Sequence, residues 1–336
     1  MVNLQNEFIE FHDKIKLDGE NQVLREKRDI LLNKLKNNIS DDAATYTTFN
    51  QGSYAMGTGI KPEDDDYDID VGIRFSIDHD DYEDPIVPKK WVRDALDGHT
   101  KSVKIRRSCV TVTYQKDDEP IYHVDFAVYA NSNADGKMYV AKGKEFSDDE
   151  NKFWEISEPQ ELIDTINGKY DDAEDRAQYK RTIKYLKKWK MHNSKLTGNG
   201  APTGIAITVL AYNYFNVSKE YDYFSSKYVY DDFSALYAFV ETIKSSFVLA
   251  YSSEMEDFYH KISINLPVEP QNNLFDKMTE NQMETLYQEV STMLDKLNKV
   301  KEKGKKSEAC EILVELFGAD FPVTVDKSLV GTSESA

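Results

Sequence analysis

The chain of 336 residues has only two cysteines, Cys109 and Cys310, which lie far apart and outside any CxxC pattern. Their scarcity excludes a disulfide framework and a cysteine-based zinc cluster, and it is typical of a protein kept in a reducing cytoplasm. Long apolar runs are also lacking, since GIAITVLAYNYF is too short to span a bilayer. Residues 1–20 lack the basic start and apolar run of a signal peptide. We therefore expect a soluble cytoplasmic protein with no membrane partner.

Positive charge is in deficit, because 60 acidic residues against 42 Lys and Arg give a formal net charge of −18. Proteins that follow a nucleic-acid backbone usually need a basic face, since phosphate neutralisation and counterion release supply most of their non-specific affinity. The charge argues against a nucleic-acid partner without excluding a local basic groove. It does not argue against small phosphate ligands that arrive with a divalent metal. The apolar share of 40% is enough for a sizeable core.

The pattern of helical and β-type segments in the sequence predicts two lobes, residues 1–150 and 151–326, and a flexible tail, residues 327–336. Residues 3–38 are expected to be helical, because apolar residues recur there at near-helical spacing. Short β-type runs follow from about Thr45 to about Ser147: TYTTFNQ, DYDIDVGIRF, SVKIRRSCVTVTYQ and IYHVDFAVYA. A helix is expected near Lys89. The remainder of the chain is expected to be all-helical.

Acidic residues crowd into the stretch FNQGSYAMGTGIKPEDDDYDIDVGIRF, residues 49–75. Side chains alternate between the two faces of a strand, so Asp68 and Asp70 point one way while Ile69 and Val71 point into a core. Asp125 occupies the middle of the apolar run IYHVDFAVYA. If these two strands are neighbours, three carboxylates converge on one patch.

Carboxylates packed this closely cost free energy unless a cation or protons neutralise them. Mg²⁺ prefers one or two carboxylates together with water and substrate phosphates, and two such ions can activate a hydroxyl and stabilise a leaving pyrophosphate. For Asp68 and Asp70 we favour this interpretation, whereas for residues 63–66 we favour a solvated acidic loop. Asp125 taken alone is ambiguous. An EF-hand is excluded, because Ile69 and Phe75 stand where that loop needs Gly and Glu.

The loop GSYAMGTG precedes the acids and lacks the Lys and the spacing of a Walker A motif. Its small residues still allow backbone N–H groups to approach a phosphate, particularly where a loop opens a helix. Ser53 can add a hydroxyl donor. Gly-Ser alone is a weak signal, but Gly-Ser followed by Asp-Ile-Asp and a later strand Asp is a much rarer combination.

The segments QGSYAMGTG, DYDIDVG and HVDFAVYA together resemble the polymerase-β-like nucleotidyltransferases, whose pattern is Gly-Ser, then Asp-x-Asp, then a third Asp on a later strand. Within that superfamily the chain looks most like the cGAS/DncV-like nucleotidyltransferases (CD-NTases) of bacterial anti-phage (CBASS) signalling. FWEISEPQELI, KRTIKYLKKWK and APTGIAITVLAYNYF resemble further segments of these enzymes. The resemblance implies an α+β, two-lobed fold with a mixed β-sheet lobe, which includes an N-terminal helix, and a C-terminal helical-bundle lobe.

The resemblance also implies roles for the residues of the acidic patch and its loop. Gln51, Gly52 and Ser53 would cradle a triphosphate. Asp68 and Asp70 would hold two Mg²⁺ ions, for which Mn²⁺ can substitute. Asp125 would bind the catalytic metal and help to deprotonate the attacking hydroxyl.

In the helical lobe, Lys184 or Lys187 and Thr203 would contact substrate phosphates. The two lysines lie one helical turn apart, which leaves the choice between them open, and a solvated helix face is the alternative for both. Gly204 departs from the family, because some relatives have an aromatic residue there that stacks on a base. Tyr54 and Tyr212 are the remaining candidates for that contact.

The function implied is the synthesis of a cyclic di- or trinucleotide second messenger from nucleoside triphosphates, ATP expected among them, with release of pyrophosphate. The implied partners are a product-sensing effector and, at the C-terminal tail, regulatory proteins or ubiquitin-like conjugating enzymes. One alternative is transfer of a nucleotide to an RNA end, a protein or a small molecule, and the acidic charge counts against RNA. The other is an inactive nucleotide-binding fold, which the three acids and Gly-Ser disfavour. The sequence leaves bases, linkage and ring size open.

Overall fold

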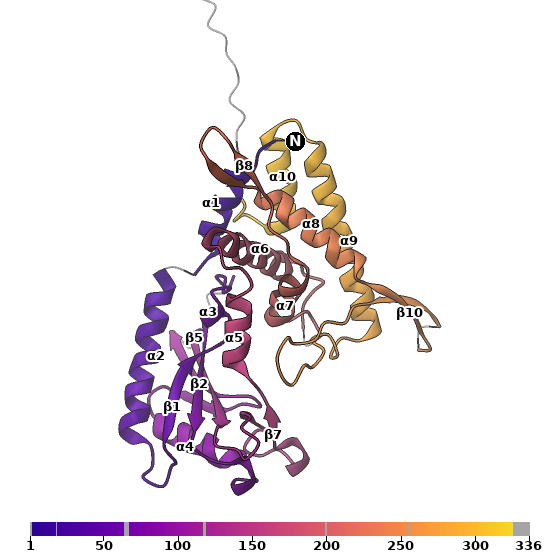
Figure 1. The fold of residues 1–336 in the computed structure, drawn as a ribbon. Coiled ribbons are helices and arrows are strands. Elements are labelled where there is room, and N and C mark those ends of the chain that lie inside the picture. The colour runs from indigo at the N-terminus through magenta and orange to yellow at the C-terminus, as the bar shows by residue number, and fades with distance from the viewer. Residues whose placement is uncertain are drawn as a thin grey trace, which may run out of the picture. The chain divides into compact units, whose positions relative to one another are not determined.

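The computed structural model describes residues 2–17, 19–63, 67–116, 119–198, 200–254 and 256–324. The chain forms two compact units (Figure 1). The sheet unit contains Lys16–Tyr170 and Asn265–Asn273, and the helical unit contains Met1–Ile15, Asp171–Ile264 and Leu274–Ala336. The expected tail, residues 327–336, and residues 64–66 of the expected acidic loop lie outside the described residues.

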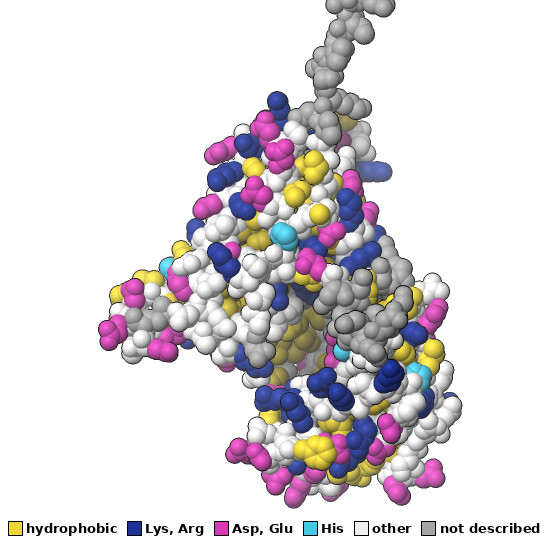
Figure 2. All heavy atoms as spheres, turned by 180° about the vertical axis from the view of Figure 1, so that it is seen from behind, with side chains coloured by type: hydrophobic (Ala, Val, Ile, Leu, Met, Phe, Trp, Pro, Cys, Tyr) yellow, Lys and Arg dark blue, Asp and Glu magenta, His cyan; other side chains and the backbone are white. Residues whose placement is uncertain are grey.

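Acidic and basic side chains are interspersed over the face drawn in Figure 2. On that face the Lys and Arg side chains do not join into one continuous basic surface, in keeping with the net charge of −18. Among the described residues, no helix combines the length and the apolar character needed to cross a membrane.

A mixed sheet of seven strands forms the centre of the sheet unit. Its path is β1 (Tyr46–Asn50), β2 (Tyr67–Phe75), β5 (Glu119–Ala130), β4 (Val110–Lys116) and β3 (Ser102–Ile105), with β6 (Tyr139–Lys142) beside β5 and β7 (Phe153–Ile156) beside β6. β2 and β5 run parallel, and the other neighbours run antiparallel. The predicted α+β class with a mixed sheet is confirmed.

Two helices, α2 (Gly19–Asn38) and α4 (Ile86–Leu96), cover the apolar face of this sheet. Ile69 and Val71 of β2 and Val124 of β5 are fully or almost fully buried against them. The alternation predicted for these strands is therefore confirmed, and the acids lie on the opposite face. Two shorter helices, α3 (Gly52–Met56) and α5 (Pro159–Asn167), contact each other in the same unit.

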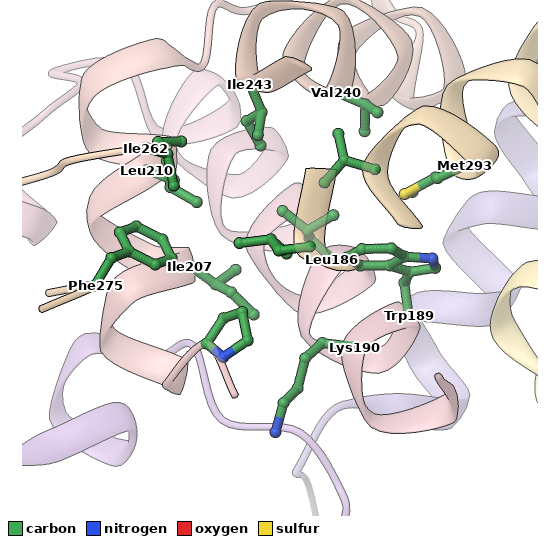
Figure 3. A pocket seen from close by; sticks show the side chains of 13 residues that line it. Leu186, Trp189, Lys190, Ile207, Leu210, Val240, Ile243, Ile262, Phe275 and Met293 are labelled. Carbon is green, nitrogen blue, oxygen red and sulfur yellow. The ribbon is translucent and has the colours of Figure 1, made fainter. Parts of the chain in front are cut away.

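The helical unit consists of six helices and two β-hairpins in its described residues. The helices are α1 (Gln5–Ile15), α6 (Ala173–His192), α7 (Gly204–Tyr214), α8 (Asp232–Ser245), α9 (Glu280–Glu302) and α10 (Lys306–Phe317). The hairpins are β8 (Lys219–Asp222) with β9 (Lys227–Tyr230), and β10 (Val248–Ser252) with β11 (Asp257–Lys261). Side chains from α6, α7, α8 and α9 surround a small apolar cavity, with Lys190 at its edge (Figure 3).

Three details differ from the sequence-based expectation. The back half is not all-helical, because it contains the two hairpins and because β7 joins the sheet through β6. The sheet unit extends to Tyr170 and not to residue 150. The N-terminal helical region is two helices, and α1 belongs to the helical unit, where Phe8 and Phe11 pack against the buried ring of Tyr185.

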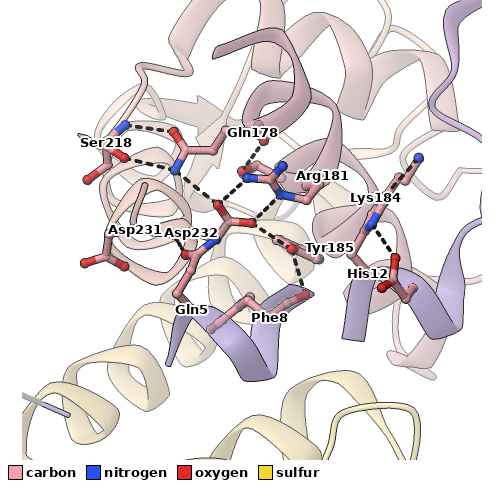
Figure 4. Close-up of polar contacts among 12 residues, drawn as sticks. Gln5, Phe8, His12, Gln178, Arg181, Lys184, Tyr185, Ser218, Asp231 and Asp232 are labelled. Atoms are coloured by element: carbon pink, nitrogen blue, oxygen red, sulfur yellow. Dashed lines mark hydrogen bonds and ion pairs between the residues drawn. The ribbon is translucent and has the colours of Figure 1, made fainter. Parts of the chain in front are cut away.

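A buried polar network holds the helical unit together around Asp232, which is fully buried at the start of α8 (Figure 4). Its carboxylate accepts hydrogen bonds from Arg181 (2.6 and 2.8 Å), Gln178 (3.1 Å) and Tyr185 (2.9 Å). Its backbone N–H donates to Gln5 of α1 at 2.7 Å. Burial alone would raise the pKa of Asp232, but the hydrogen bonds and charge of Arg181 outweigh it and hold that pKa below its usual value. The ion pair is therefore intact at neutral pH.

Replacing Asp232 by Ala should destabilise the helical unit by about 3–5 kcal/mol, because Arg181 would remain in a largely buried site without its counter-charge. Urea unfolding followed by circular dichroism measures the loss. Glu315→Ala is the control, since Glu315 forms an ion pair with Lys296 at 3.0 Å while 62% of its side chain is exposed, and it should change stability by less than about 1 kcal/mol. Equal losses in the two variants would contradict this role of the network.

Candidate functional site

The three predicted acids converge at the pairing of β2 with β5. In the parallel register Asp70 stands opposite Asp125, and Asp68 stands opposite His123. One carboxylate oxygen from each of Asp68, Asp70 and Asp125 lies within 4.8 Å of the others. Asp68 is exposed and the other two are half-buried. The two strands that carry the acids are therefore neighbours, as the convergence of the three carboxylates requires.

In this acidic triad (Asp68, Asp70 and Asp125), carboxylates lie close to one another, and the effect on protonation is seen at Asp70. Burial, and then the charge of Asp125, raise the pKa of Asp70 from 3.8 to about 6. Desolvation and a like charge both favour the protonated form of a carboxylic acid. A divalent cation would relieve both effects at once.

The donor set of the acidic triad fits a hard divalent cation. Asp125 Oδ1 is buried and accepts no hydrogen bond from any group in the described ranges. A buried carboxylate oxygen without a partner is costly, and a coordinated cation would satisfy it. Carboxylate oxygens within a few ångströms of one another are the ligands that Mg²⁺ and Mn²⁺ prefer. The three acids could therefore hold metal.

The loop after β1 lies directly against the acidic triad. The Gln51 backbone N–H donates to the Asp70 carbonyl oxygen at 3.1 Å. Gly52 has a φ of +67°, and a Cβ added there would lie 1.9 Å from Asp70 Oδ2. Only glycine combines that backbone conformation with so close an approach. Gly52 is thus required for the acid strand to sit beneath the loop.

Ser53 lies in the short helix α3, which begins at Gly52 and is capped after Met56 by Gly57 in a left-handed conformation. Its carbonyl oxygen accepts hydrogen bonds from the backbone N–H groups of Gly57 and Thr58, the latter at 2.9 Å. Asn167 of α5 donates to the carbonyl oxygen of Ala55 at 3.3 Å. These contacts fix the turn that carries the Ser53 hydroxyl.

Two residues that the sequence interpretation did not single out also adjoin the acidic triad. Tyr129 of β5 is buried and donates to Gln51 Oε1 at 2.8 Å. Burial, and then the charge of Asp125, raise the pKa of Cys109 to about 12, so this thiol stays protonated at neutral pH. Period-two spacing from Asp125 puts Tyr129 on the acid face of its strand and could have revealed it. The sequence gives no such indication for Cys109.

Lys187 and Thr203, in the helical unit, come together at the start of α7. Thr203 caps this helix by accepting from the Ala206 N–H at 3.2 Å, and the hydroxyl hydrogen stays available for donation. A Cβ added to Gly204 would lie 3.7 Å from Lys187 Nζ. Burial, and then the charge of Lys184, lower the pKa of Lys187 to about 7. Backbone N–H groups, a hydroxyl and a buried amine thus meet at a helix N-terminus, which attracts anions.

Lys184 has a different neighbour, since its Nζ lies 3.3 Å from His12 Nε2 of α1 (Figure 4). Of the two tyrosines considered for base stacking, Tyr54 accepts a hydrogen bond from Arg25 Nε through its hydroxyl. Tyr212 is half-buried on α7. The geometry thus separates Lys187, beside Gly204, from Lys184, beside α1.

A second acidic group, Asp78, His79 and Asp80, has ligand atoms within 4.8 Å of one another. Asp78 already accepts from the backbone N–H groups of Asp80 and Ala134, at 3.0 and 3.1 Å. These bonds lower the pKa of Asp78. The His79 ring stacks on Tyr139 with centroids 4.1 Å apart. The contacts of Asp78 and His79 therefore stabilise the loop in which they lie.

Without divalent metal, Asp70→Asn should melt at a higher temperature than the wild-type protein at neutral pH. The raised pKa means that the folded chain holds the Asp70 proton more tightly than the unfolded chain does. The ionisation of Asp70 therefore lowers the free energy of unfolding as the pH rises from 3.8 to about 6, and this loss of stability persists at higher pH. The difference between the two proteins should shrink as the pH falls below about 6. Melting curves across this pH range measure it.

Asp68→Asn is the matched control, because Asp68 lies on the same strand but is exposed. Its effect on the melting temperature should be smaller. An Asp70→Asn protein that melts below the wild type at neutral pH would show that the carboxylate is satisfied by the protein alone.

The segment that carries the acidic triad matches a known domain model. Residues 47–129 match the family described as cyclic GMP-AMP synthase DncV-like, nucleotidyltransferase domain. A cyclic GMP-AMP synthase of Escherichia albertii is 31% identical over 172 residues, which cover 48% of this chain and 35% of that enzyme. The matched segment therefore spans about a third of the length of that relative.

Solved structures share the fold over almost the whole chain. Vibrio cholerae DncV, a cyclic AMP-GMP synthase, superimposes with a TM-score of 0.70 at 14% identity, covering 95% of this chain and 97% of DncV. E. coli CdnC with ATP gives 0.63 at 19% identity, with 96% and 99% covered. Bradyrhizobium diazoefficiens CdnG with GTP gives 0.67 at 12% identity, with 94% and 95% covered. Residues 47–129 thus match a DncV-like nucleotidyltransferase domain, and the chain as a whole shares the fold of DncV, CdnC and CdnG.

Proposed function

We propose that this protein is a metal-dependent nucleotidyltransferase that makes a cyclic di- or trinucleotide from nucleoside triphosphates and releases pyrophosphate. The observation that carries the proposal is the convergence of Asp68, Asp70 and Asp125 beside the Gly-Ser loop, with a buried and unsatisfied oxygen on Asp125. Support comes from relatives named as cyclic GMP-AMP or cyclic AMP-GMP synthases and from structures named as complexes with ATP or GTP.

Asp68, Asp70 and Asp125 would hold two Mg²⁺ ions, and Mn²⁺ would substitute. When bound, these cations neutralise the triphosphate and polarise the reacting oxygens. Gln51, Gly52 and Ser53 bind the phosphate chain, the glycine by admitting it close to the backbone. Asp125 accepts the proton of the attacking 2′- or 3′-hydroxyl as that oxygen bonds to the α-phosphorus and pyrophosphate leaves. The residues act mainly by positioning groups and stabilising charge.

In the helical unit, Lys187 and Thr203 bind phosphate at the N-terminus of α7. The phosphate charge would raise the pKa of Lys187 from about 7, so the lysine takes up a proton when nucleotide binds near neutral pH. Lys184, which contacts His12, contributes at longer range through its charge. A place in bacterial anti-phage signalling, with a product-sensing effector and conjugation at the tail, belongs to the same proposal and is supported by the resemblance to the CD-NTases.

Transfer of a nucleotide to another acceptor is the second candidate, because the same three carboxylates would serve it. Incubation of the purified protein with all four NTPs and Mg²⁺ or Mn²⁺, followed by phosphatase treatment and mass spectrometry, separates the two. Cyclic products would support the proposal and identify the bases. Nucleotide binding without any cyclic product would favour the other acceptor, or a missing activator.

The double variant Asp68→Asn, Asp70→Asn should form no detectable product, because neither residue of β2 could then hold metal. Its melting temperature should equal or exceed that of the wild type, since the repulsion with Asp125 is relieved. The two readouts separate a loss of chemistry from a loss of fold. Unaltered turnover in this variant would refute the assignment of the metal site.

Lys187→Met should weaken nucleotide binding on the order of tenfold to a hundredfold, the range for one hydrogen bond to a charged group. Its stability at neutral pH should not fall, because a buried amine with a lowered pKa is itself a cost to folding. Lys184→Met is the matched variant and should weaken binding less. Calorimetric titration with a non-hydrolysable ATP or GTP analogue and Mg²⁺ tests both. A larger effect at Lys184 would reverse the assignment.

A further inference from the structure

Tyr129 occupies an unusual place on the acid face of β5. It follows Asp125 at even spacing along the strand and is only 3% exposed. Its ring packs at 5.8 Å from Phe49, within a small apolar cluster that also contains Ala127, Met138 and Val140. The hydroxyl of this buried ring points at the Gly-Ser loop, where it donates to Gln51 Oε1 at 2.8 Å. A buried polar tip of this kind needs its partner.

The bond to Tyr129 determines which way the Gln51 amide faces. Burial raises the pKa of Tyr129, so the phenol keeps its proton and remains a donor at neutral pH. In the structure this hydroxyl donates to the amide oxygen of Gln51, so the planar amide directs its NH₂ group, with two donors, away from Tyr129. The NH₂ group is the end of the side chain that suits a phosphate oxygen.

The main chain of Gln51 is held from a second direction. Its N–H donates to the Asp70 carbonyl oxygen at 3.1 Å, and the next residue, Gly52, lies against the Asp70 carboxylate. Backbone and side chain of Gln51 are thus attached to two neighbouring strands, β2 and β5. The side-chain attachment depends on one hydroxyl.

We propose that Tyr129 is a positioning residue, which holds the Gln51 side chain so that its NH₂ group faces a phosphate of the bound nucleotide. The inference rests on the proposed function and deepens it. Tyr129 does not touch the substrate itself. Its effect on nucleotide binding is transmitted entirely through Gln51.

If Tyr129 acts through Gln51, the effects of substituting the two residues on nucleotide binding should not be additive. Tyr129→Phe keeps the ring packing and removes the hydroxyl, and Gln51→Met keeps the length of the side chain and removes the amide. Each should weaken binding of a non-hydrolysable ATP or GTP analogue with Mg²⁺ roughly tenfold, the size expected for one buried hydrogen bond. The double variant should bind no more weakly than Gln51→Met alone, because residues acting through one contact are coupled.

Tyr139→Phe is the control for removal of a tyrosine hydroxyl. Tyr139 lies on β6 of the same sheet, and its hydroxyl donates to Asp135 at 2.7 Å, outside the proposed nucleotide site. This variant should bind the analogue as the wild type does. In Tyr129→Phe, KM should rise while kcat at saturating nucleotide changes less, and the melting temperature should stay near that of the wild type.

The outcomes separate the inference from the proposed function. If the wild type binds the nucleotide analogue and the Tyr129→Phe protein binds it equally well, the inference is overturned and the proposed function stands. Additive losses in the double variant would also overturn it, since Tyr129 would then act independently of Gln51. A wild-type protein that binds no nucleotide would overturn the proposed function, and the inference with it.

Discussion

The parallel pairing of β2 with β5 is the constraint on which the rest of the site depends. Parallel strands in register bring residues of equal depth side by side, and here that register sets Asp70 opposite Asp125. The apolar residues that alternate with them are buried beneath α2 and α4, so a slip of one residue would expose the core. The hydrophobic effect thus holds like charges together against their repulsion.

That repulsion makes the site receptive to cations. The folded chain contains a carboxyl whose pKa is raised to about 6 and, on Asp125, a buried oxygen that has no hydrogen-bond partner among the described residues. Neither helps the chain to fold, and both are relieved when positive charge arrives. Lys187 presents the complementary case in the helical unit, where a buried amine with a lowered pKa lies near a helix N-terminus and is relieved by an anion. Perturbed pKa values of this kind are typical of sites that bind charged ligands.

Much of the acidic site could be predicted from the sequence, because the period of a strand fixes which side chains share a face. That rule was enough to put Asp68 and Asp70 on one face, whereas Asp125 was ambiguous alone and was assigned through the resemblance to the CD-NTases. The adjacency of their strands could not be derived from period alone, since strand order is set by contacts between distant segments. For the same reason α1 was assigned to the wrong lobe: Phe8 and Phe11 are apolar in any helix, and only their contacts with Tyr185 reveal their unit. The short hairpins β8–β9 and β10–β11 were missed because their exposed aromatic residues have no clean alternation of buried and polar positions.

The most direct test of the account is whether the acidic triad binds metal together with nucleotide. Electron paramagnetic resonance of Mn²⁺, titrated with protein and a non-hydrolysable ATP or GTP analogue, measures the protein-bound ion. The account predicts a bound Mn²⁺ signal in the wild type that Asp125→Asn abolishes or greatly weakens, although the variant remains folded. Mn²⁺ bound equally by the two proteins would contradict the central claim that these acids are gathered to hold metal.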